Sequence, residues 1–180
     1  MSRSLMVYSS DFAAVVAAAG SQDRGLVKQL VRSDDSPELQ VAIEELVMRT
    51  GPHEKHNSMW LAFAQERLCA AYGQSLSNDA VSGTSLSRLE TLDEGLVASG
   101  LGLTLQELMY GGGPIASLPW PDDFPSTGTW PPEIIGPALE LYDRLSPTSD
   151  DDAVDELLVC IGDWLRTARA RGYGLVGFYY

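Results

Sequence analysis

The residues best suited to chemistry are two neighbouring acids, Asp122 and Asp123, which stand between Trp120 and Phe124. Paired carboxylates beside aromatic surface can transfer protons, or hold a cationic or sugar ligand. The same Pro-Asp-Asp sequence is also typical of a turn whose side chains accept hydrogen bonds from nearby amides. We therefore keep two interpretations of these acids, a functional site or a structural loop.

Two histidines, His53 and His56, are the only ones in the chain. A zinc protease needs His-Glu-x-x-His on a helix, and here the second histidine comes one residue too early. Gly51-Pro52 before them indicates a loop that leads into a helix. We expect neither a metal nor a cofactor, and we regard both histidines as weak catalytic candidates.

The remaining reactive residues favour structural roles. Cys69 and Cys160 each lie within an apolar helical pattern, where a thiol packs as a small hydrophobic group and its pKa is raised. The run Gly111–Gly113 has neither the lysine nor the preceding strand of a phosphate-binding loop. It predicts a flexible turn.

These residues depend on a long irregular segment, Tyr110 to Pro125, whose three glycines and four prolines exclude a regular helix. Its apolar side chains are too many for a solvated linker, so we expect it to pack on the rest of the protein. The segment supplies our candidate binding residues Trp120, Phe124 and Tyr110. The aromatic pair Tyr179 and Tyr180 can either pack in the core or line a groove near this segment.

Helical periodicity and capping signals surround this segment. Ser36-Pro37-Glu38 is an N-cap followed by a first-turn proline and acid, and Asp150–Asp152 precede the clearest amphipathic pattern, which ends at Gly172 or Gly174. The polar stretch Ser75 to Thr84 predicts a loop. We expect about seven helices in all, including helices near residues 12–19, 21–32, 37–50, 58–72, 86–100 and 132–145.

Two short β-prone runs lie at opposite ends of the chain, Leu5 to Tyr8 and Leu175 to Tyr180. Lone strands bury little surface, so we expect the two to be neighbours in one small sheet packed against the helices. The predicted fold class is α+β, a predominantly helical single domain spanning residues 1–180.

The chain carries 25 acidic and 12 basic side chains, for a formal charge of −13. Such a charge repels nucleic acid and anionic membranes, and it suits solubility or a basic protein partner. The first residues have the pattern of neither a signal peptide nor a transmembrane segment, so we expect neither there. With two cysteines and no disulfide framework, a cytoplasmic location is the simplest expectation.

Three segments together resemble a bacterial family known only as a domain of unknown function. They are Ser4 to Tyr8, the loop Leu-Pro-Trp-Pro-Asp-Asp-Phe-Pro at residues 118–125, and the ending Arg-Gly-Tyr-Gly-Leu-Val-Gly-Phe-Tyr-Tyr at residues 171–180. More loosely, a first strand, a helical middle and a closing helix with a short strand look like the YfbM-like fold. Neither resemblance implies an activity.

Three functional hypotheses remain open. The first is an acidic, non-enzymatic interaction protein that neutralises a basic partner such as a toxin. The second is a small hydrolase whose pocket lies between the 110–125 loop and the 53–60 helix entrance, with Asp122 or Asp123 and His53 or His56 as acid and base. The third is a structural homodimer subunit with Trp120 and Phe124 in its interface.

Overall fold

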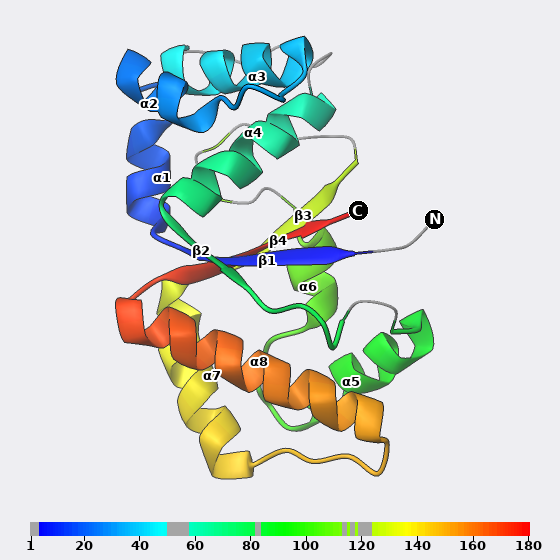
Figure 1. Cartoon of the computed structure of the whole chain (residues 1–180). Helices are drawn as coiled ribbons and strands as arrows, with labels where there is room; N and C mark the ends of the chain where they lie inside the picture. The colour runs from blue at the N-terminus through cyan, green and yellow to red at the C-terminus, as the bar shows by residue number, and fades with distance from the viewer. Residues whose placement is uncertain (1–3, 50–57, 82–83, 113–114, 116–117, 119–123) are drawn as a thin grey trace.

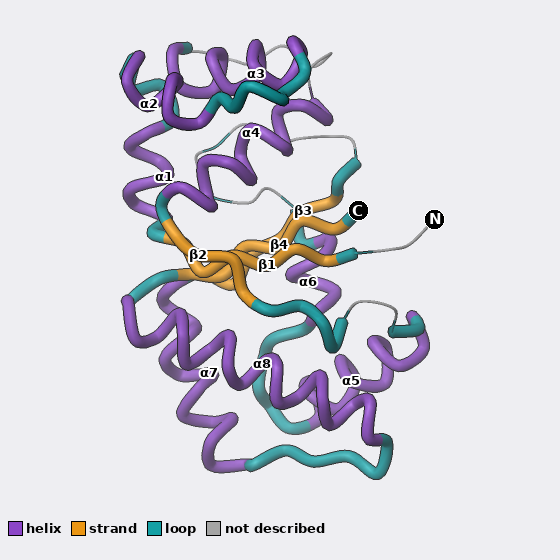
Figure 2. Tube along the Cα trace, in the orientation of Figure 1, coloured by secondary structure: helices purple, strands orange, loops and turns teal. Residues whose placement is uncertain are grey.

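The computed structural model describes residues 4–49, 58–81, 84–112, 115, 118 and 124–180. Within these residues it has eight helices and four strands, so the α+β, mainly helical prediction is confirmed. Figure 1 shows the sheet between two groups of helices, and Figure 2 shows the same layers by type of structure.

The sheet is antiparallel, with the order β2-β1-β4-β3. Its strands are β1 Leu5–Ser10, β2 Gly73–Leu76, β3 Ser126–Trp130 and β4 Gly174–Tyr179. β1 and β4 form the central pair, in a register that places Leu5 opposite Tyr179 and Ser10 opposite Gly174. The predicted pairing of these two strands is confirmed.

The two terminal strands form the centre of the sheet, and two strands that were not predicted lie beside them. These are the edge strands β2 and β3. β2 includes Ser75 and Leu76, the first two residues of the predicted 75–84 loop, which are therefore strand and not loop. β2 has a glycine and no β-branched or aromatic residue, so its extended form depends on the partner strand more than on local preference. In β3, a glycine interrupts two threonines and a tryptophan that favour a strand.

Four helices cover one face of the sheet (Figure 1). They are α1 Phe12–Ala18, α2 Arg24–Leu30, α3 Pro37–Met48 and α4 Ser58–Ala71. Tyr8, Val176 and Phe178 of the strands pack among their side chains. The other four helices, with Leu5, Val7 and Leu175, form the cluster on the opposite face. They are α5 Leu86–Ala98, α6 Leu105–Tyr110, α7 Pro132–Leu145 and α8 Asp152–Arg171.

Local capping explains the best-defined helix ends. The Ser36 hydroxyl accepts a hydrogen bond from the Leu39 amide at 3.3 Å at the start of α3. The Asp151 carboxylate caps α8 by accepting from the Ala153 amide at 2.9 Å, and Gly172 ends this helix in the left-handed conformation. These are the caps that the sequence predicts.

Helix α6 lies unusually close to the sheet because two glycines face it. Gly128 of β3 and Gly177 of β4 are direct cross-strand partners. A Cβ atom added at Gly128 would lie 1.8 Å from the Glu107 carbonyl oxygen, and one at Gly177 would lie 2.4 Å from that of Leu108. The backbone of α6 therefore rests directly on strand backbone, where only glycine fits.

Candidate functional site

Most of the predicted site residues lie outside the residues that the structure describes: His53, His56, Trp120, Asp122 and Asp123. Their roles stay predictions. Of the candidate binding residues, Phe124 and Tyr110 are described, and their side chains are 51% and 49% exposed.

The two described candidates lie on opposite faces of the sheet. Tyr110 meets the ring of Tyr179 edge-on, with centroids 5.3 Å apart, whereas Phe124 meets Tyr180 edge-on at 6.0 Å. Tyr179 belongs to the cluster under α5–α8 and Tyr180 packs against the cluster under α1–α4. Tyr110 and Phe124 therefore do not converge on one pocket, although each lies beside one of the two terminal tyrosines.

A row of aromatic rings joins the start of α4 to the end of the irregular segment. Trp60 packs on Phe63 at 5.7 Å, and Phe63 stacks on Tyr180 at 5.6 Å with an interplanar angle of 22°. Phe124 approaches the same tyrosine from the irregular segment. Tyr180 is thus the point at which the helix entrance and the loop end meet.

The hydroxyl groups of Tyr8 and Tyr180 share the carboxylate of Glu66 on α4. Tyr8 donates a hydrogen bond to Oε1 at 2.8 Å, and Tyr180 donates one to Oε2. Burial raises the pKa of both tyrosines above its ordinary value, and the negative charge of Glu66 raises each further. Both hydroxyls therefore remain protonated donors at neutral pH, and the trio joins β1 and the chain end to α4.

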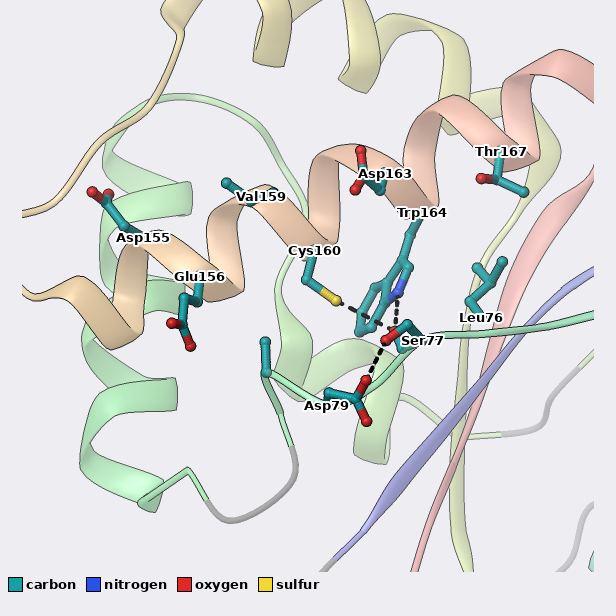
Figure 3. A pocket seen from close by; sticks show the side chains of 11 residues that line it. Leu76, Ser77, Asp79, Asp155, Glu156, Val159, Cys160, Asp163, Trp164 and Thr167 are labelled. Carbon is teal, nitrogen blue, oxygen red and sulfur yellow. Dashed lines mark hydrogen bonds between the residues drawn. The ribbon is translucent and has the colours of Figure 1, made fainter.

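A hollow of about 610 Å³ lies between α8 and the segment that follows β2, as Figure 3 shows. Its apolar wall includes Leu76, Val159 and Trp164. The Trp164 indole N–H donates to the Ser77 carbonyl oxygen at 2.7 Å, and the Cys160 thiol donates to the same oxygen at 3.4 Å. These bonds hold the segment after β2 against α8, and they define what we call the α8–β2 hollow.

The α8–β2 hollow is acidic. Four carboxylates line it: Asp79, Asp155, Glu156 and Asp163. Among the described residues that line the hollow, none is Lys, Arg or His. Asp163 accepts a hydrogen bond from Arg166 at 3.3 Å, which offsets part of its charge. The hollow therefore suits a cation with an apolar stem.

Neither cysteine is placed to act as a nucleophile at neutral pH. Burial raises the pKa of Cys160 to about 11, and the charges of Asp163 and Asp79 raise it further. Cys69 is fully buried, which raises the pKa of its thiol to about 12. The expected core position is confirmed for Cys69, whereas Cys160 is partly exposed at the wall of the α8–β2 hollow.

A second hollow, of about 560 Å³, lies between α5 and α6. Tyr110 and Met109 form its wall on α6, and Leu86 and Val97 of α5 line it as well. Asp93 accepts hydrogen bonds from the Leu105 and Gln106 amides at 2.7 and 2.9 Å, so α5 holds the start of α6 in place. Burial raises the pKa of Asp93 while these amides lower it.

Comparison with known proteins assigns the chain to a family. The model of a domain of unknown function, DUF7691, matches residues 1–180. The chain belongs to the DUF7691 family. No curated protein and no solved structure matches it, so the looser resemblance to the YfbM-like fold stays a prediction.

Within the described part of this DUF7691 chain, no helix is both long and apolar enough to cross a membrane. The same residues contain no group of three or more His, Cys, Asp or Glu side chains that could hold a metal ion.

Sequence reasoning missed Glu66 and both hollows of the DUF7691 chain. The spacing of α4 does contain a signal for Glu66. Phe63, Glu66 and Cys69 are each three positions apart, so Glu66 lies on the same face of the helix as these two apolar residues. The hollows had no such signal, because residues 76–80 and 155–167 meet only through the tertiary fold.

Proposed function

We propose that this DUF7691 protein is a binding protein for a basic partner, and that a lysine or arginine side chain of the partner enters the α8–β2 hollow. The observation that supports this most is the lining of that hollow, four carboxylates beside an apolar wall with no basic side chain among its described residues. The net charge of −13 points in the same direction.

The stem and the head of such a side chain need different surroundings. The methylene groups of lysine or arginine pack on Leu76, Val159 and the edge of Trp164, while the charged head stays near Asp79 and Glu156 at the rim. One exposed ion pair contributes only about 0–1 kcal/mol, so binding depends on several carboxylates together and weakens with salt. The acidic field of the whole protein speeds the encounter.

The two other hypotheses depend on residues outside the described part of the chain. A hydrolase would need Asp122 or Asp123 to converge with His53 or His56. A homodimer through Trp120 and Phe124 has one described member, Phe124, whose ring is 51% exposed. Light scattering of the wild type and of Trp120→Ser tests the dimer.

The test of the binding proposal titrates a hexalysine peptide into the labelled protein and follows the Trp164 indole N–H signal by NMR. We expect the double variant Asp79→Asn, Glu156→Gln to weaken binding about tenfold. The matched control is Glu38→Gln, Glu44→Gln on α3, which removes the same charge from exposed positions on the opposite face of the sheet. Equal losses in both variants would show that only the overall charge matters, and the proposal would fail.

A further inference from the structure

Helix α5 carries two large apolar side chains that lie outside the core. Its inward face consists of Leu89, Leu92 and Leu96, which are all nearly buried. Leu86 and Val97 lie on another side, 42% and 60% exposed. They are 11 positions apart on the same side of the helix, with Glu90 and Glu94 between them, and both line one hollow, which makes this side a candidate contact surface.

Apolar side chains also line the α6 side of this hollow. Leu86 and Val97 line the hollow together with Met109 and Tyr110, and the Tyr110 ring is 49% exposed. We call this surface the α5–α6 groove. It is about 560 Å³ in volume, and α5 with its 13 residues extends for about 20 Å. A partner helix of three to four turns has the length of α5, and the hollow has room for the side chains of one of its faces.

The charges along the α5–α6 groove are all negative. Glu90 and Glu94 are exposed one turn apart on α5, and Asp93 of the same helix accepts hydrogen bonds from the first amides of α6. Among its described lining residues the groove has no Lys, Arg or His. Arg88 of the same helix is engaged elsewhere, since its guanidinium bonds Asp151 at 3.1 Å.

We propose that the α5–α6 groove docks a basic amphipathic helix of a partner protein. The apolar side of that helix packs on Leu86, Val97 and Tyr110, and its lysines or arginines face Glu90 and Glu94. A second copy of this chain is a poor occupant, because it would bring another net charge of −13 against these acids.

This proposal does not rest on the α8–β2 hollow. The two hollows share no described lining residue, since one belongs to α8 and the segment after β2 and the other to α5 and α6. They also call for different ligands. A single cationic side chain suffices for the first, whereas the second needs an apolar helix face next to positive charge.

The probe is a fluorescein-labelled 14-residue peptide of leucine and lysine, patterned so that the leucines form one helical face. Fluorescence anisotropy measures its affinity for the wild type and for Val97→Asp. We expect Val97→Asp to weaken binding at least tenfold. The matched control is Val41→Asp, because Val41 is 49% exposed on α3 and that helix lies on the opposite face of the sheet. It should change the affinity less than threefold.

A second pair of variants keeps the test valid if Val97→Asp is poorly folded. Glu90→Lys, Glu94→Lys reverses the groove charges, and Glu38→Lys, Glu44→Lys makes the same change on α3. We expect the first pair to weaken binding at least fivefold more than the second. Far-UV circular dichroism confirms that each variant is folded.

Four results would overturn the proposal. They are no detectable binding of the patterned peptide, equal binding of a scrambled peptide without an apolar face, equal binding of a leucine and glutamate peptide, and a wild-type dimer that Val97→Asp abolishes. The last would make a second copy the occupant. Hexalysine binding to the α8–β2 hollow is measured separately, so either proposal can fail while the other stands.

Discussion

Replacing Gly128 by alanine tests the close contact between α6 and the sheet. The added Cβ would lie 1.8 Å from the Glu107 carbonyl oxygen and 2.8 Å from the Leu108 carbonyl carbon and oxygen. Real Cβ atoms essentially never approach closer than 3.0 Å, so α6 must move away by about 1.2 Å. Every atom in conflict belongs to the backbone, and no side-chain rotation can relieve it.

The expected loss follows from the cost of overpacking, which is about 1–3 kcal/mol and occasionally more. We place Gly128→Ala at the upper end, about 3 kcal/mol, because the helix moves as a unit and its contacts with both β3 and β4 are lost together. For a chain of this size, 1 kcal/mol corresponds to about 2–4 °C in melting temperature. We therefore expect the melting temperature to fall by about 6–12 °C.

Gly95→Ala is the matched control. Gly95 lies within α5, and a Cβ there meets nothing within 4 Å. Alanine is favoured over glycine in a helix by about 0.5–1 kcal/mol, so this variant should melt slightly above the wild type. Thermal and urea unfolding, followed by circular dichroism, measure both variants. A Gly128→Ala protein that melts within 2 °C of the wild type would refute the proposed contact.

The other predictions concern the titratable side chains. Iodoacetamide should modify Cys160 about tenfold more slowly than an ordinary thiol at pH 7.5. A pKa of about 11 lowers the fraction of thiolate about 100-fold, and the more basic thiolate is about tenfold more nucleophilic, which offsets part of that loss. Native Cys69 should not react before unfolding, and rapid labelling of either thiol, detected by mass spectrometry, would contradict the pKa assignments. The free energy of unfolding should fall as the pH rises above about 10. The pKa values of Tyr8 and Tyr180 are higher in the folded protein than in the unfolded chain, so the unfolded chain loses these protons first and is stabilised. In Glu66→Gln this alkaline loss should begin at the same pH but level off at a lower pH, because removing the charge lowers both folded-state pKa values. Urea titrations carried from pH 8 to 12 measure it, since the two profiles separate only at the alkaline end, and identical profiles there would show that Glu66 has no such effect.

Local signals made much of the helical part of the fold predictable. Ser36-Pro37 marks the start of α3 and Gly172 the end of α8, because a cap depends on residues within one turn of it. Helix α2 shows the limit of this reasoning. It begins at Arg24 with Asp23 as its cap, whereas the sequence predicts a start near residue 21.

The edge strands and the hollows required information that is not local. The β3 sequence Ser-Thr-Gly-Thr-Trp contains a glycine that weakens a strand prediction, yet that glycine is what lets α6 approach the sheet. In the same way, Asp79 and Glu156 are ordinary surface acids in the sequence. They become one candidate site only when the Trp164 and Cys160 bonds to Ser77 join distant segments.

Because β1 pairs with β4 at the centre of the sheet, the sheet can form completely only after β4 has been synthesised. About 160 residues separate these two strands, which a ribosome adds over roughly 10 to 30 s. Throughout that interval β1 can pair only with β2, and neither apolar cluster has its β4 residues. Nascent chains of this protein should therefore stay sensitive to protease until β4 has emerged, and their half-built sheet edge is a surface that chaperones would be expected to cover.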